Sequence, residues 1–98
     1  MILAIDIGNT NIVLGCVDDE KTYFIERLST IKTKMELEYA IDIKMVLDIH
    51  GIKPEKLEGA IISSVVPQIT YVVKEAAEKI LKKETLVIGP GVKNGLNI

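Results

Sequence analysis

The chain begins with two short apolar segments separated by a glycine-containing turn, and this feature constrains its fold most. Residues 2–7 predict a buried strand with Asp6 near its end, Gly8-Asn9-Thr10 predicts a turn, and residues 11–17 predict a second strand rich in β-branched side chains. Strands joined by so short a turn pair antiparallel. The chain therefore starts with a β-hairpin that carries a carboxylate beside its turn.

The next segments extend the hairpin and then change to helical spacing. A polar turn at 18–21 leads to a third predicted strand over 22–28. Thr33 and Glu36 fit a capping box at the start of a helix, and Gly51 is suited to end it. We expect the core-facing residues of this helix to be those that repeat every four positions: Leu37, Ile41, Met45 and Ile49.

The last third of the sequence predicts two strands, over 59–66 and 84–88, with a helix starting at Pro67 between them. Strands reached through helical crossovers favour parallel pairing, with the helices packed on the sheet. The predicted order is therefore β-β-β-α-β-α-β in a mixed α/β domain. The length of 98 residues predicts one domain.

Charge and hydropathy exclude several classes of function. The net charge is −2, from 12 basic and 14 acidic residues, so electrostatics give no reason to expect nucleic acid or an anionic membrane as a partner. No apolar run approaches the roughly 18 residues that span a bilayer, and no secretory signal pattern is found before Asp6. Cys16, the only cysteine, lies in an apolar strand pattern that predicts a small buried side chain. It cannot form an internal disulfide, so a reducing cytoplasm is expected.

The turn after the first strand has residues suited to phosphate. Gly8 lets the backbone approach a ligand closely, and N–H groups exposed in such a turn can bind phosphate oxygens. A carboxylate buried among apolar neighbours needs a partner, and Asp6 would repel bare phosphate, so Mg²⁺ is expected between them. The alternative is a plain hairpin turn without a ligand. The segment is neither a Walker loop nor a dinucleotide-binding fingerprint.

Other polar residues have two interpretations each. Arg27 suits either a salt bridge at a strand end or a contact on the substrate side. Ser63 and Ser64 suit a helix cap before Pro67 better than a ligand contact. His50 suits the end of a helix, where the dipole favours a cation, better than a catalytic role. Lys93 is interpreted as a solvated side chain, with anion binding as the alternative.

Four segments together resemble one family. Asp6-Ile7-Gly8-Asn9-Thr10-Asn11 resembles the first phosphate motif of the type III pantothenate kinases, in the superfamily of sugar kinases, Hsp70 and actin. The segments that agree in order with later parts of that family are Arg27-Leu28-Ser29-Thr30, Ser63-Ser64-Val65-Val66-Pro67 and the glycine-containing residues 91–98. The resemblance spans the whole chain.

The resemblance implies a fold, an activity and a set of site residues. Residues 1–98 would be the N-terminal nucleotide-binding half of a ribonuclease H-like, actin-like ATPase fold. The activity would be ATP-dependent phosphorylation of pantothenate, the first step towards coenzyme A. Arg27 and Thr30 would be candidates for the substrate side, and Asp6 would hold Mg²⁺ directly or through water. The residues corresponding to the ATP-phosphate loop are Asp6, Ile7, Gly8, Asn9, Thr10, Asn11, Ile12 and Val13.

The resemblance also implies parts that these 98 residues do not contain. The family's Gly-x-Asp-Arg segment, with the expected general base, would follow Ile98, and a second phosphate motif and a K⁺ or NH₄⁺ site would lie in an absent second half. We therefore expect the chain alone to be inactive and its parent to be a cytoplasmic homodimer. The alternatives are a non-catalytic regulatory module on the same fold and, less well matched in the first loop, an actin-like or Hsp70-like ATPase.

Overall fold

Five strands form one sheet in the order β3-β2-β1-β4-β5 in the computed structural model, which describes residues 1–88. The first three strands form an antiparallel meander, and the last two run parallel to β1, as the sequence predicts. A short 3-10 helix over Pro54–Lys56 is the one element added to the predicted order. The strand bounds are Ile2–Ile7 for β1, Asn11–Val17 for β2, Thr22–Ser29 for β3, Ala60–Ser64 for β4 and Thr85–Ile88 for β5.

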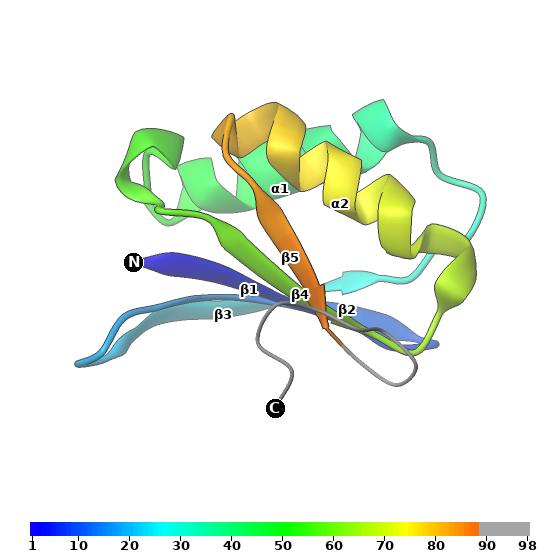
Figure 1. Ribbon diagram of the computed structural model, residues 1–98, viewed down its shortest axis with the longest axis horizontal. Coiled ribbons are helices and arrows are strands. Elements are labelled where there is room, and N and C mark those ends of the chain that lie inside the picture. The colour runs from blue at the N-terminus through cyan, green and yellow to red at the C-terminus, as the bar shows by residue number, and fades with distance from the viewer. Residues whose placement is uncertain (89–98) are drawn as a thin grey trace.

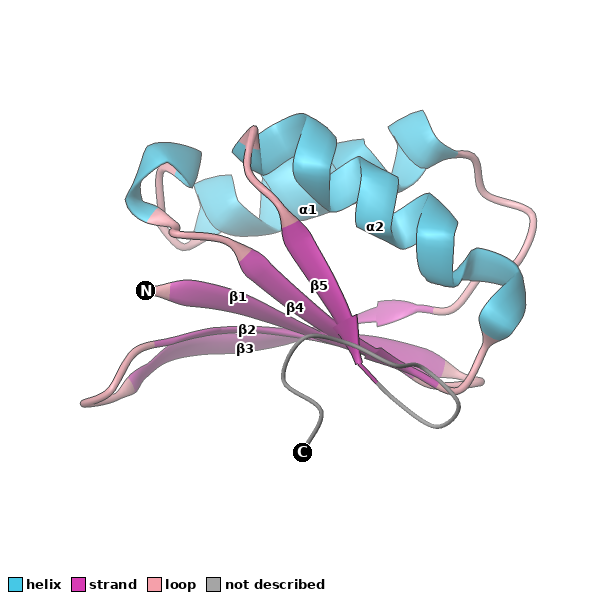
Figure 2. Ribbon diagram, in the orientation of Figure 1, coloured by secondary structure: helices cyan, strands magenta, loops and turns pink. Residues whose placement is uncertain are grey.

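Two helices cover one face of this sheet (Figure 1). Helix α1 spans Glu36–Ile49 and connects β3 to β4, and helix α2 spans Pro67–Leu81 and connects β4 to β5. Both lie on the same side of the strands, as the secondary-structure colouring shows (Figure 2). No other helix or strand within residues 1–88 lies on the opposite face, which we call the open face.

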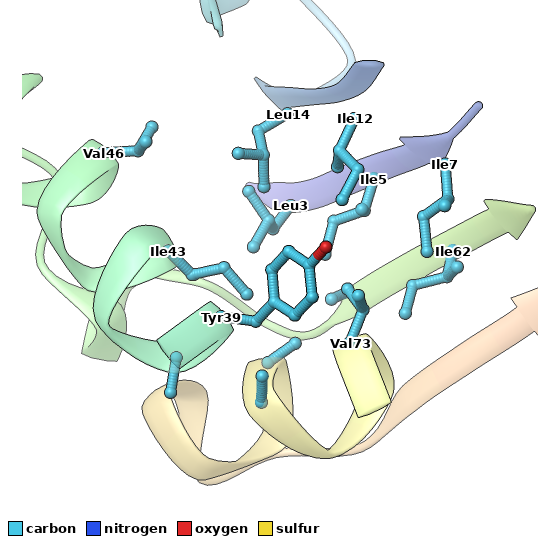
Figure 3. Close-up of a cluster of buried hydrophobic side chains, with 14 of the residues drawn as sticks. Leu3, Ile5, Ile7, Ile12, Leu14, Tyr39, Ile43, Val46, Ile62 and Val73 are labelled. Carbon is cyan, nitrogen blue, oxygen red and sulfur yellow. The ribbon is translucent and has the colours of Figure 1, made fainter. Parts of the chain in front are cut away.

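The core lies between the sheet and the helices and follows from the strand period of two. Leu3, Ile5 and Ile7 of β1 are at most 2% exposed and face the helices. Tyr39 of α1 is 1% exposed, and its ring lies among the side chains of β1, α1 and α2 (Figure 3). Cys16 is fully buried, which confirms its interpretation as a small core residue.

The prediction of which face of α1 meets the core is wrong. Its buried residues are Tyr39, Ala40, Ile43, Val46 and Leu47, whereas Leu37, Ile41, Met45 and Ile49 are 50–70% exposed. Both sets of residues have helical spacing, so this helix is apolar on two sides. The sequence pattern could not choose between them. In the structure, the face that carries the large Tyr39 side chain is the one packed on the sheet.

The ends of α1 differ in how well the sequence predicts them. Thr33 does not cap the helix; its first residue is Glu36, and the reach-back contact of a capping box joins the Met35 N–H to Glu38 Oε1 at 2.7 Å. The other end is confirmed. Gly51 has a φ of 70°, and the N–H groups of Gly51 and Ile52 donate to the carbonyls of Asp48 and Leu47 in a Schellman motif.

His50 holds the end of α1 against β3. Its ring stacks on Phe24 with centroids 4.4 Å apart, and its Nε2 lies 2.7 Å from Glu26 Oε2. These contacts give His50 a structural role, as the sequence favoured.

No helix in the described part of the chain is long and apolar enough to cross a membrane.

A matched pair of alanine variants tests the orientation of α1. Ile43→Ala removes a side chain that is 2% exposed and should lower the free energy of unfolding by about 2–5 kcal/mol through lost burial and a cavity. Ile41→Ala removes a side chain that is 50% exposed and should change it by roughly 0.5 kcal/mol. Urea denaturation of both variants decides, and a larger loss for Ile41→Ala would contradict the orientation.

Candidate functional site

The carboxyl ends of the three parallel strands meet at one edge of the sheet. β1 ends at Ile7, β4 at Ser64 and β5 at Ile88, and their register places these ends side by side. The turn formed by residues 8–10 lies at this edge, because it follows β1 directly. In open α/β sheets, ligands bind outside the carboxyl ends of the strands. The predicted phosphate turn therefore lies where this architecture favours a ligand.

A row of side chains crosses the open face next to this edge. The register pairs Asp6 with Val13 of β2 and with Ser63 of β4, and these in turn pair with Arg27 of β3 and Ile88 of β5. Residues directly opposite one another share a face of a sheet. A shallow hollow on this face is lined mainly by apolar side chains, with Asp6, Ser63 and Thr22 as its polar residues. Asp6 is the one charged side chain among these described lining residues.

Asp6 is exposed to solvent, contrary to the prediction of a buried carboxylate. Ile5 and Ile7 are buried because they point to the helices, whereas the strand period turns Asp6 to the open face. None of the ion pairs among residues 1–88 involves Asp6. Its carboxylate is therefore accessible to a cation, although burial does not force it to have a partner.

Hydrogen bonds from two neighbouring segments hold the turn between β1 and β2. The Gly8 N–H donates to the Asn11 carbonyl at 2.9 Å and closes the turn at its base. From the chain after β4, the Val65 N–H donates to the Ile7 carbonyl at 3.0 Å. From the chain after β3, Thr30 binds two carbonyls: its N–H donates to Thr10 at 2.9 Å and its Oγ1 to Gly8 at 2.7 Å. The turn is thus fixed from the sides of both flanking strands.

The turn itself combines a tight glycine with exposed polar side chains. A Cβ at Gly8 would lie 3.1 Å from the Asn11 carbonyl oxygen, so the turn closes this tightly only without a side chain there. Asn9, Thr10 and Asn11 are all exposed. Ile7 and Ile12 point into the core, so only their backbones can face a ligand. The arrangement can offer an anion uncharged donors together with backbone N–H groups.

The two serines after β4 have different surroundings. Ser64 Oγ accepts from the Val66 N–H at 3.0 Å and from Thr70 Oγ1 at 2.9 Å, so it ties the start of α2 although the N-cap residue is Val66. Ser63 does not cap the helix. It lies beside Asp6 on the open face and is the site residue that the sequence assigned elsewhere. Only the register of β1 with β4 reveals this position.

Arg27 and Thr30 have different surroundings in the structure. Arg27 is exposed on the open face and forms no ion pair with another residue of 1–88, so the predicted salt bridge is not found there. It lies two strands from Asp6, a Cα separation of about 10 Å. Thr30 instead contacts the turn through its hydroxyl. The predicted glycine-containing segment 91–98, with Lys93, lies outside the described residues.

The residues at the site fit Mg²⁺ only as part of a complex with a ligand. Within residues 1–88, no group of three or more carboxylate, imidazole or thiol side chains could hold a metal ion. Mg²⁺ keeps several waters and commonly binds through one or two carboxylates together with phosphate oxygens. The single carboxylate of Asp6, with the Ser63 hydroxyl in the paired position, matches that mode of binding. A metal at this site would therefore need further ligands, such as water and phosphate oxygens.

Comparisons with known sequences agree on one family. A family model described as type III pantothenate kinase matches residues 2–98. Two curated relatives, the type III pantothenate kinases of Halalkalibacterium halodurans and an Exiguobacterium species, are each 42% identical over 98 residues. Each match covers 100% of this chain but 39% of the relative. The chain thus spans about two-fifths of the length of the curated relatives it matches.

Comparisons with solved structures agree on the fold. A Porphyromonas gingivalis protein named as an N-acetylglucosamine kinase matches 91% of this chain and 34% of its own, with a TM-score of 0.67 and 19% identity. A ROK hexokinase from Thermus thermophilus gives a TM-score of 0.65 at 14% identity, covering 90% and 34%. RuvC of the same organism gives 0.57 at 14% identity, covering 91% and 63%. These likenesses confirm the predicted fold class, shared by sugar kinases and ribonuclease H-like proteins.

Two glycine variants test whether the turn depends on its tight closure. Gly8→Ala places a Cβ 3.1 Å from a backbone oxygen and should displace the turn, whereas Gly15→Ala meets its nearest atom at an ordinary 3.6 Å. We expect Gly8→Ala to move the amide NMR resonances of Asn11 and Thr30. Gly15→Ala should shift only resonances around its own position on β2. Unchanged Asn11 and Thr30 resonances in Gly8→Ala would show that the turn does not need glycine there.

Proposed function

The chain belongs to the type III pantothenate kinase family, and on that premise we propose that it supplies the ATP-phosphate site of an enzyme that phosphorylates pantothenate. One observation carries this proposal. The carbonyls of the β1–β2 turn are hydrogen-bonded by neighbouring segments, while the accessible carboxylate of Asp6 lies on the open face near the end of β1. In this proposal, residues 1–98 form the nucleotide-binding half of the enzyme, and the remaining parts of the site belong to a segment outside them.

Each residue of the turn has a role that follows from its chemistry. Backbone N–H groups of the turn, with the side chains of Asn9, Thr10 and Asn11, bind the oxygens of the β- and γ-phosphates. Asp6 holds the hydrated metal against those phosphates, and Mg²⁺, when bound, would offset the charge of the phosphates during transfer. Gly8 keeps the backbone close enough for these contacts. Ile12 and Val13 support the turn as the second and third residues of β2.

Phosphoryl transfer in such an enzyme depends mainly on positioning and electrostatics. The phosphate charge would repel an exposed carboxylate, so binding of the nucleotide at Asp6 requires the cation. We assign no general base within residues 1–88, and the carboxylate of Asp6 has the metal role. The K⁺ or NH₄⁺ ion, the homodimer and the cytoplasmic location remain predictions from the family resemblance.

Asp6→Asn in the full-length gene product tests the function. This change keeps the side-chain shape and removes the charge that holds the hydrated cation, so we expect formation of phosphopantothenate from ATP and pantothenate to fall about 10- to 100-fold. Raising the Mg²⁺ concentration should restore part of the rate. Mass spectrometry of the product measures both effects, with K⁺ present throughout.

Asp19→Asn is the matched control, because Asp19 lies in the exposed turn between β2 and β3. It should leave the rate unchanged. A folded, unmodified protein that forms no phosphopantothenate would reject the activity. If that protein still bound ATP, the result would favour the alternative of a non-catalytic binding module. Full activity of Asp6→Asn would reject the proposed role of Asp6 but not the proposed activity.

A further inference from the structure

Thr30 contacts the phosphate turn through two different atoms. Its hydroxyl Oγ1 donates to the Gly8 carbonyl at 2.7 Å, and its backbone N–H donates to the Thr10 carbonyl at 2.9 Å. The two acceptors lie on either side of Asn9, and Thr30 is 22 residues from Gly8 in sequence. One residue from another strand end therefore fixes both peptide groups that bracket the centre of the turn.

These two bonds determine where the N–H groups of the turn point. A trans peptide is planar, with its N–H directed opposite to its C=O, and no cis peptide occurs in the described chain. Because the carbonyls of Gly8 and Thr10 point to Thr30, the N–H groups of Asn9 and Asn11 point away from it. Those are the groups that a phosphate at this edge of the sheet would meet.

Thr30 is itself held in place by the core. The next residue, Ile31, forms two hydrogen bonds with the Tyr39 hydroxyl: its N–H donates to that oxygen at 3.0 Å, and its carbonyl accepts from it at 2.6 Å. Tyr39 is 1% exposed and packed between the sheet and the helices (Figure 3). On the other side, Ser29 is paired with Asn11 of β2. The position of Thr30 is thus set by the buried Tyr39 hydroxyl on one side and by the pairing of β3 with β2 on the other.

We propose that Thr30 is a positioning residue that orients the backbone N–H groups of the phosphate turn, and not a contact on the substrate side. This inference rests on the proposed function, since it assumes that ATP phosphates bind at the turn. The Thr30 hydroxyl is committed to the Gly8 carbonyl, so it has no second proton to donate to a substrate. Its loss would leave that carbonyl without this partner and free the peptide to rotate.

The test uses three variants of the full-length gene product. Thr30→Val keeps the shape and removes the hydroxyl, Thr30→Ser restores the hydroxyl, and Thr33→Val is the matched control in the exposed loop before α1. Two readouts are needed: the ¹³C carbonyl NMR resonance of Gly8, and the values of kcat/KM for ATP and KM for pantothenate. Thermal melting of each variant checks that it is folded.

We expect Thr30→Val to move the Gly8 resonance upfield and to lower kcat/KM for ATP about three- to tenfold, the factor typical of one net hydrogen bond. KM for pantothenate should stay constant, and Thr30→Ser should recover both values. Thr33→Val should match the unmodified protein.

Three outcomes would overturn the proposal. An unmoved Gly8 resonance would show that Thr30 does not hold the turn. A changed KM for pantothenate with a constant kcat/KM for ATP would place Thr30 on the substrate side. A loss in Thr30→Val that Thr30→Ser does not recover would show that the hydroxyl is irrelevant. An inactive unmodified protein would reject the proposed function separately, and the Gly8 resonance would still decide whether Thr30 holds the turn.

Discussion

The hydrogen bonds that bind the carbonyls of the β1–β2 turn are the interactions on which the site depends. A tight turn between strands leaves backbone groups that neither strand pairs, and each needs a partner. Here the carbonyls of Ile7, Gly8 and Thr10 find their partners in the segments that follow β4 and β3. The N–H groups on the opposite sides of the Gly8–Asn9 and Thr10–Asn11 peptides remain available to a ligand, whereas the Gly8 N–H is bonded to the Asn11 carbonyl. The sheet order, which puts β4 and β2 on the two sides of β1, is what brings those partners within reach.

Most of the fold could be predicted because its signals are local. The turn glycines, the strand periods and Pro67 at the start of α2 depend on neighbouring residues, and β2 was predicted with the bounds that the structure has. The orientation of α1 could not be predicted, because the helix is apolar on two faces and only packing against the sheet selects the Tyr39 face. The start of α1 could not be predicted either, because Glu38 and not Glu36 makes the reach-back contact.

Residue types predicted the motif of the candidate site but not how its residues are arranged in space. The motif from Asp6 to Asn11 could be identified from residue types alone. That Asp6 is exposed, that Ser63 lies beside it and that Thr30 binds the turn all depend on strand register and on long-range contacts. The sequence predicted parallel pairing but not the register of β1 with β4, which joins residues more than 50 positions apart. The family resemblance predicted the phosphate and metal roles, whereas strand register and long-range contacts show which residues lie beside one another.

The central claim is that the β1–β2 turn binds the phosphates of ATP with Asp6 holding the metal. A crystal structure of the full-length gene product with Mg²⁺ and a non-hydrolysable ATP analogue tests it most directly. We expect phosphate oxygens within hydrogen-bonding distance of the N–H groups of Asn9 and Asn11, and a Mg²⁺ ion bound to Asp6 directly or through water. Phosphates bound elsewhere, with the turn contacting no nucleotide, would contradict the claim.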